Sequence, residues 1–227
     1  KHPYVLAITG ASGVIYATRL LEVLINTGCD VHLTISPSGA LVLKQELDIL
    51  VDLDAFQESS LMLDLEKSAS DSKLEMTRSM AGVSTEESNV LSIATKEPGR
   101  ILYHHHEDYM APIASGSFRT SGMIVCPCSS STMSAIVHGT GDNLIHRAAD
   151  VHLKESRQLV LVPRETPLSV IQLENMRRAA EAGAVVLPAM PGWYHGVETL
   201  GDLVDFVAAR ICDQLGIENT LMRRWGS

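Results

Sequence analysis

An arginine and a glutamate stand next to each other directly after an apolar run. Residues 159–162 are Leu-Val-Leu-Val, and Pro163, Arg164 and Glu165 follow them. Four consecutive aliphatic residues are typical of a strand inside a sheet, and two unpaired charges at its tip would be costly. A guanidinium that binds a phosphate through two hydrogen bonds, beside a carboxylate that exchanges protons, would explain both residues.

Small hydroxyl residues follow two other apolar runs. Residues 4–8 continue into Thr-Gly-Ala-Ser-Gly at 9–13, and residues 122–128 continue into Ser-Ser-Ser-Thr at 129–132. A helix that begins there carries free N–H groups, which attract phosphate, and hydroxyls could add donors. A helix cap explains any single hydroxyl more simply. Five such positions at one sheet edge favour a phosphate-bearing ligand, and they are Ser12, Ser129, Ser130, Ser131 and Thr132.

Two absent motifs narrow the kind of phosphate ligand. Residues 10–13 read Gly-Ala-Ser-Gly, which differs from the Gly-x-Gly-x-x-Gly of dinucleotide sites, and no Walker A sequence is present. A dinucleotide or nucleoside triphosphate site of the usual form is therefore disfavoured. A mononucleotide is compatible with the sequence.

Further cations lie in segments with helical periodicity. Arg147 and Lys154 are seven positions apart, so they share one side of a helix, and Asp150 lies between them. Spacing alone favours a solvated ladder of salt bridges over a ligand site. Arg210 flanks the apolar stripe of the last helical segment, where arginines commonly extend to solvent.

Neither the histidines nor the cysteines predict a metal site. Residues 104–106 are three histidines without an evident carboxylate partner, and in an extended segment at most two of them could share a metal. A polar strand end is the favoured interpretation. Tyr194 and His195 follow the last expected strand, and we expect the tyrosine to face a ligand. The four cysteines lack zinc-site spacing and are expected to be buried free thiols.

Alternating apolar runs and amphipathic segments position these residues. We expect strands at 4–10, 30–36, 122–128, 159–162 and 184–189, and helices at 13–28, 38–47, 130–139, 143–156, 169–183 and 199–216. This order predicts one α/β domain over residues 1–227, with an open parallel sheet as the middle of three layers. Residues 48–100 are polar with weak periodicity, and we expect an exposed insertion there.

Charge and hydropathy argue against several classes of protein. The chain has 18 basic and 27 acidic residues and a net charge of −9, which argues against a general nucleic-acid binder. No apolar run approaches the length of a membrane span, and the first residues lack the pattern of a signal peptide. We therefore expect a cytoplasmic protein that binds neither nucleic acid nor membranes.

Six sequence blocks outside the 48–100 segment resemble the UbiX flavin prenyltransferase family. They are residues 8–22, 111–117, 126–155, 159–176, 183–195 and 202–217. The wider superfamily includes flavin-dependent cysteine decarboxylases, but their Pro-x-Met-Asn-x-x-Met-Trp segment is absent here. The resemblance implies a Rossmann-like flavoprotein fold with an αβα sandwich.

The resemblance also implies an activity. Family members join a dimethylallyl group from dimethylallyl phosphate to N5 and C6 of reduced FMN without a metal, and the prenylated FMN serves a UbiD-type decarboxylase. They form dodecamers with sites at subunit interfaces, so basic residues of one chain could complete the site of another. Two alternatives remain open, a flavin-dependent cysteine-type decarboxylase and a non-catalytic FMN carrier.

The same resemblance implies roles for individual residues. Those implied to hold FMN are Gly10, Ala11, Ser12, Ser36, Ser129, Ser130, Ser131, Thr132 and Arg164. Those implied to surround dimethylallyl phosphate are Ser115, Gly116, Arg147, Lys154, Glu165, Tyr194 and Arg210. The implied catalytic set is Ser12, Glu46, Arg147, Lys154, Glu165 and Trp225. In that set Glu46 acts with Ser12 in proton transfer around N5, and Trp225 covers the prenyl group.

The chain departs from the family pattern in two places. The 48–100 segment is longer than the family pattern, and Phe118 and Arg119 stand where the family often has smaller, less charged residues. The number of phosphates on the prenyl donor is therefore left open.

Overall fold

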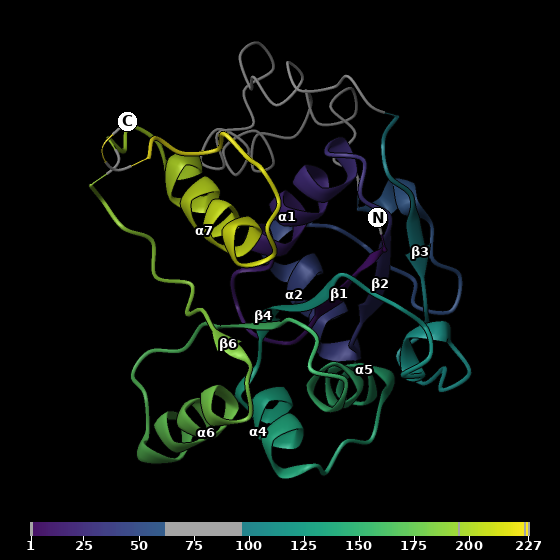
Figure 1. Ribbon diagram of the computed structural model, residues 1–227. Coiled ribbons are helices and arrows are strands. Elements are labelled where there is room, and N and C mark those ends of the chain that lie inside the picture. The colour runs from purple at the N-terminus through teal and green to yellow at the C-terminus, as the bar shows by residue number, and fades with distance from the viewer. Residues whose placement is uncertain (1, 62–96, 195, 225, 227) are drawn as a thin grey trace.

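The structure is a computed structural model that describes residues 2–61, 97–194, 196–224 and 226. These residues contain a six-stranded sheet in the order β3-β2-β1-β4-β5-β6, in which every neighbouring pair is parallel (Figure 1). The strands are β1 (Tyr4–Ile8), β2 (Val31–Ile35), β3 (Ile101–Tyr103), β4 (Gly122–Cys128), β5 (Leu159–Pro163) and β6 (Val185–Val186). The helices are α1 (Val14–Asn26), α2 (Pro37–Leu47), α4 (Ser130–His138), α5 (Leu144–Lys154), α6 (Val170–Glu181) and α7 (Leu200–Gln214), with short 3₁₀ turns at η1 (Glu58–Ser60) and η4 (Pro112–Ala114).

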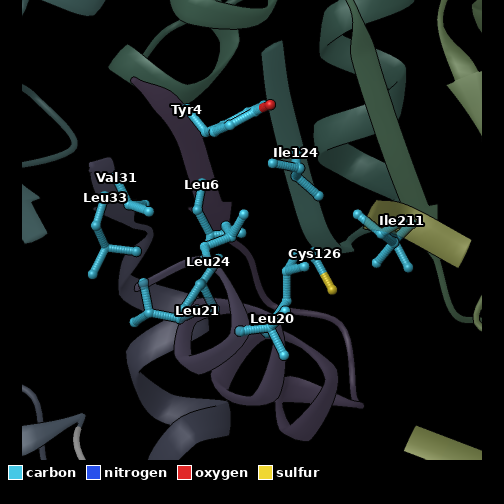
Figure 2. Close-up of a cluster of buried hydrophobic side chains, with 14 of the residues drawn as sticks. Tyr4, Leu6, Leu20, Leu21, Leu24, Val31, Leu33, Ile124, Cys126 and Ile211 are labelled. Atoms are coloured by element: carbon cyan, nitrogen blue, oxygen red, sulfur yellow. The ribbon is translucent and has the colours of Figure 1, made fainter. Parts of the chain in front are cut away.

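Helices cover both faces of the sheet. Leu6 and Ile8 of β1 belong to a buried cluster with α1, α2 and α7, whereas Val5 and Ala7 belong to a second cluster with α4, α5 and α6. Figure 2 shows the first cluster, where leucines of α1 meet side chains of the central strands. β1 is apolar at every position because a central parallel strand faces a core on both sides. The three-layer αβα fold predicted from the sequence is confirmed.

The last strand is shorter than predicted. β6 is Val185–Val186, whereas the apolar run suggested 184–189. The backbone N–H groups of Leu187 and Ala189 still donate to carbonyls of β5, at 2.8 and 2.9 Å. Pro188 lies between them, at the position whose backbone nitrogen faces away from β5 on this edge strand, so the proline costs no bond to β5.

The described beginning of the 48–100 segment is attached to the core. Ile49 and Leu61 are buried, and Phe56 stacks on Tyr103 with ring centroids 4.2 Å apart. Residues 62–96 lie outside the described residues. The expected insertion therefore stays a prediction, although its first residues are not simply exposed.

A helix that crosses a bilayer must be long and apolar, and this applies to the helices in the described ranges. None of them combines the length and the apolar character that crossing a membrane demands.

Candidate functional site

The loops that follow β1 and β4 are joined by Thr9. Its hydroxyl donates to the carbonyl oxygen of Pro127 at 2.7 Å and accepts from the backbone N–H of Ser129 at 2.8 Å. The strand order reverses between β1 and β4, and open α/β sheets bind ligands at such a switch point. Thr9 therefore holds loops 9–13 and 129–132 side by side where a ligand is expected, and we refer to these two loops as the switch-point loops. It was not predicted as a site residue, although a polar residue directly after an apolar run was a usable signal.

The second of these loops begins α4. Ser129 caps the helix, because its Oγ accepts from the backbone N–H of Thr132 at 3.2 Å. The same Oγ lies 2.9 Å from the hydroxyl of Thr132 and 3.1 Å from that of Ser131. A helix cap is thus the right description of Ser129. The other hydroxyls gather at the positive N-terminus of the helix, where they can serve as donors to an anion.

The first loop packs closely on the start of α2. A Cβ built on Gly10 would lie 2.4 Å from the Cβ of Ser38, so a side chain at that position does not fit. Ala11 is buried, and Ser36 caps α2 by accepting a backbone hydrogen bond at 3.0 Å. The predicted cofactor residues Gly10, Ala11, Ser12 and Ser36 therefore lie on adjoining loops, at the carboxyl ends of β1 and β2.

Glu46 reaches the first loop from α2. Its Oε2 accepts from the backbone N–H groups of Gly13 at 2.9 Å and Val14 at 3.1 Å. These N–H groups begin α1, where negative charge is stabilised. Gly13 has a φ of 101°, a left-handed conformation that glycine adopts without strain. The carboxylate is thus fixed next to the loop of Ser12, the residue with which it was predicted to act.

Arg164 and Glu165 leave β5 at the same edge of the sheet. Nε of Arg164 donates to the carbonyl oxygen of Ser12 at 3.2 Å. Glu165 is exposed, and its Oε2 accepts from Nε2 of Gln172 at 3.3 Å. Both charged residues line one cavity with Ser130. Neither forms an ion pair with another residue in the described ranges, so the two charges do not neutralise each other.

Arg147 lies in a second group of predicted residues, where α5 meets η4. Its Nε donates to the carbonyl oxygen of Ala114 at 3.0 Å, and its Nη1 pairs with Asp150 at 2.8 Å. The salt bridge suggested by the spacing is therefore present. The bond to Ala114 adds something the spacing did not predict, since it attaches the arginine to the segment that carries Ser115.

Lys154 lies in the same group. Its ammonium pairs with the carboxylate of Glu155, and a Cβ built on Gly116 would lie only 2.8 Å from Nζ of Lys154. The glycine therefore lets the lysine approach the backbone of segment 114–117. The hydroxyl of Ser115 lies 2.9 Å from that of Ser117 in this segment. Four predicted residues are thus brought together, and we refer to them as the α5 group: Ser115, Gly116, Arg147 and Lys154.

The switch-point loops and the α5 group lie at opposite ends of the strands, the loops at the carboxyl edge of the sheet and Lys154 at the amino edge. Lys154 ends α5 and precedes the amino end of β5, whereas Arg164 follows the carboxyl end of the same strand. Five residues of strand span about 16 Å. Within one described chain, the cation of Lys154 is therefore separated from the switch-point loops, and the predicted residues do not form a single cluster.

Arg210 and Tyr194 lie near β6 and α7. Arg210 pairs with Asp213 at 2.8 Å and lines a groove between the strand and the helix. Tyr194 is exposed, and its ring approaches Phe206 edge-on with a centroid separation of 5.8 Å. Two further residues singled out from the sequence lie outside the described residues, His195 and Trp225.

A turn divides the histidine run. His104 contacts His32 through Nε2 and Nδ1 at 2.7 Å. The chain then turns, and the ligand atoms of His105, His106 and Glu107 lie within 4.8 Å of one another. The interpretation that no carboxylate accompanies the histidines was wrong for Glu107, because it treated the segment as extended.

All four cysteines are buried free thiols, as predicted. Burial raises the pKa of the Cys128 thiol to about 12 and also raises that of Cys126. These thiols are protonated at neutral pH, so a thiolate nucleophile at the end of β4 is disfavoured.

Known proteins are similar to this chain over its whole length. The family model described as Flavoprotein matches residues 1–212. A protein from Halalkalibacterium halodurans, described as flavin prenyltransferase UbiX, is 42% identical over 226 residues, which cover 100% of this chain and 94% of the relative.

Solved structures of UbiX-like proteins are also similar to this chain over its whole length. AnUbiX (PadA1), in complex with FMN and dimethylallyl pyrophosphate, has a TM-score of 0.76 and 34% identity, with 100% of this chain and 98% of that chain covered. A dodecameric FMN-dependent UbiX-like decarboxylase from Escherichia coli O157:H7 has a TM-score of 0.74 and 34% identity, with 99% and 100% covered. The chain therefore belongs to the flavoprotein family and, within it, to the UbiX flavin prenyltransferase family.

Proposed function

We propose that this chain is a flavin prenyltransferase. It joins the dimethylallyl group of dimethylallyl phosphate to N5 and C6 of reduced FMN, and prenylated FMN and phosphate leave. One observation carries the proposal: a switch point lined by hydroxyls and an arginine, in a chain 42% identical over its whole length to a flavin prenyltransferase UbiX.

The switch-point loops are suited to FMN. The N-terminus of α4, with the hydroxyls of Ser129 to Thr132, can bind the phosphate of FMN, and Arg164 can add charge-assisted hydrogen bonds. Gly10 lets the first loop pack directly against Ser38 at the start of α2, which keeps the loop at the switch point. Reduced FMN supplies the nucleophilic ring atoms, and the chain's own groups orient it.

Two carboxylates are placed for proton transfer. Glu46 is held at the start of α1 beside the loop of Ser12, so these two residues can move a proton near the bound ring. Glu165 lies on the cavity side of β5 and can exchange a proton with the phosphate of the prenyl donor. The two roles are separate because Glu46 reaches the site from α2, whereas Glu165 reaches it from the loop after β5.

The remaining cations are assigned to the leaving phosphate. Cleavage of the allylic C–O bond places negative charge on that phosphate and positive charge on the allyl group. Arg147, Lys154 and Arg210 can stabilise the phosphate, while Tyr194 and Trp225 can stabilise the allyl group through cation–π contact, worth on the order of 1–2 kcal/mol when desolvated.

A neighbouring chain is required for this assignment. Because Lys154 and Arg164 lie at opposite sheet edges, the α5 group of one copy must meet the switch point of another. We therefore propose a homo-oligomer with shared sites, and a dodecamer is its form, as for the similar Escherichia coli protein. A UbiD-type decarboxylase in the cytoplasm is the proposed recipient of the product.

Anaerobic incubation tests the activity directly. The protein is mixed with reduced FMN and either dimethylallyl phosphate or dimethylallyl diphosphate, and the flavin is analysed by mass spectrometry. We expect a flavin that has gained one five-carbon unit, and comparison of the two reactions shows which donor the chain uses. Unchanged flavin in both reactions would contradict the proposal, and release of carbon dioxide from a cysteinyl peptide would favour a decarboxylase instead.

A further inference from the structure

We propose that Gln172 is a positioning residue that orients the carboxylate of Glu165. This inference rests on the proposed function, because it concerns the residue to which proton exchange with the donor phosphate is assigned. Gln172 is half-buried on the first turn of α6 and lines the same cavity as Glu165 and Arg164. It belongs to none of the residue sets predicted from the sequence.

The side-chain amide of Gln172 makes three hydrogen bonds. Its Oε1 accepts from the backbone N–H of Ser169 at 2.7 Å. Its Nε2 donates to Oγ of Ser130 at 3.0 Å and to Oε2 of Glu165 at 3.3 Å. One amide thus connects the start of α6, the start of α4 and the carboxylate that follows β5.

The chemistry of the partners fixes the direction of the amide. The backbone N–H of Ser169 can only donate, so it must face the amide oxygen. An ionised carboxylate can only accept, so Glu165 must face the amide nitrogen. The amide cannot be flipped without breaking bonds at both ends. Glu165 is therefore held by a partner whose own orientation is determined.

The second oxygen of Glu165 is also engaged. Its Oε1 accepts from the backbone N–H of Thr166 at 3.3 Å. Both carboxylate oxygens thus have a donor, although the residue is exposed. Without Gln172 this side chain would keep only a bond to the neighbouring backbone, and it could adopt more rotamers.

The identity of residue 172 separates a structural role from a positioning role. Ser169 and Gln172 form a capping box at the start of α6, and such a box accepts either glutamate or glutamine at the position of Gln172. Only glutamine can also donate to Glu165. A glutamate there would keep the cap but place two carboxylates together, which is unfavourable when both are ionised.

Two variants test these roles in opposite directions. Gln172→Glu keeps the capping box and removes the donor to Glu165, whereas Ser169→Ala removes the hydroxyl cap and leaves the amide of Gln172 in place. Each purified oligomer, and the wild type, is assayed for prenylation of reduced FMN between pH 5 and pH 8, and its thermal unfolding midpoint is measured.

We expect Gln172→Glu to unfold at the wild-type temperature at pH 5, where one carboxyl can be protonated, and to lose about tenfold in kcat at pH 8, with little change in either KM. The loss should shrink toward pH 5, because a protonated carboxyl can again donate to Glu165. Ser169→Ala should unfold at a lower temperature and keep the wild-type kcat and pH profile. Gln172→Met, which has no donor, should lose activity to the same degree at every pH.

The outcomes that would overturn the inference are distinct from those that affect the proposed function. If the wild type converts no flavin, the proposed function fails and the inference fails with it. If the wild type is active and Gln172→Glu matches it in kcat and pH profile, only the positioning role is refuted. A loss that does not vary with pH and accompanies a lower unfolding temperature would also refute that role, and Gln172→Met decides the case if Gln172→Glu does not fold.

Discussion

The switch-point loops and the α5 group differ in how their functional residues are held. At the switch point, Thr9, Glu46 and Arg164 bond to backbone atoms of neighbouring loops, so the arrangement is fixed by main-chain contacts. In the α5 group, Arg147 has one bond to a backbone carbonyl, that of Ala114, but the cations of Arg147 and Lys154 are partly exposed and pair with adjacent carboxylates on their own segment. The first region is built by one chain, whereas the second presents charges that a partner can use.

This difference separates binding of the flavin from transfer of the prenyl group. A region held by backbone contacts is preorganised for a ligand, and preorganised sites bind with less ordering cost. Exposed ion pairs are worth little to stability, so their residues can be exchanged with little effect on folding. We therefore expect substitutions in the two regions to affect different measurements.

The largest expected effect concerns the α5 group. Lys154→Ala should reduce prenylation by about 10² to 10³-fold, because an electrostatic partner of the leaving phosphate is lost. Its FMN affinity should stay within about twofold of wild type, measured by quenching of flavin fluorescence. Lys44→Ala removes a lysine from the last turn of α2 and is the matched control. A large loss of FMN affinity in Lys154→Ala would remove the distinction between the two regions.

The next effect concerns the switch point. Arg164→Ala should weaken FMN binding by about tenfold to a hundredfold, since a charge-assisted hydrogen bond contributes about 1.5–3 kcal/mol. Arg164→Lys keeps the charge without the planar guanidinium and should recover only part of the affinity. Fluorescence titration measures all three proteins. An unchanged affinity in Arg164→Ala would show that the arginine does not face the flavin.

A smaller effect is expected from pH on the free energy of unfolding, and it concerns His32. Burial, followed by the nearby His104, lowers the pKa of His32 to about 4, and the ring of Phe118 packs edge-on against His32 at 5.0 Å. Between pH 6.5 and about pH 4 the unfolded chain binds more protons at this residue. The free energy of unfolding should therefore fall through that window as pH decreases, by on the order of 1–3 kcal/mol.

Urea unfolding at pH 7.5 and pH 5 measures this loss. His32→Gln should show a smaller difference between the two pH values than wild type, although other buried histidines still contribute. An equal difference in both proteins would mean that His32 is not responsible.

The fold could be predicted from the sequence because its signals are local. The apolar runs of β1 and β5 and the helical periodicity of α7 lie within segments of 5 to 15 residues. β6 is the exception, since the strand is Val185–Val186 although single backbone bonds to β5 continue as far as Ala189.

The site could be predicted only in part. Residue types after each strand indicated the correct sheet edge, because parallel strands bring their carboxyl ends together. Long-range contacts left no such signal: Glu46 meets Gly13 across 33 positions, and Arg164 meets Ser12 across 152. Spacing also could not place Lys154 and Arg164 at opposite edges, which follows only from the direction of α5 and β5. Gln172 was missed because a capping-box residue looks structural from sequence alone.

Mixed oligomers test most directly whether each site needs two chains. Lys154→Ala and Arg164→Ala chains are co-expressed with different tags, and oligomers that carry both tags are purified and assayed for prenylation. If the α5 group of one chain serves the switch point of another, random assembly leaves about a quarter of the sites with both residues intact. With FMN well below the Kd of Arg164→Ala, so that this variant binds little flavin, we predict that the mixed oligomers recover about a quarter of wild-type activity while each variant alone shows far less. Mixed oligomers no more active than either variant would contradict the shared site.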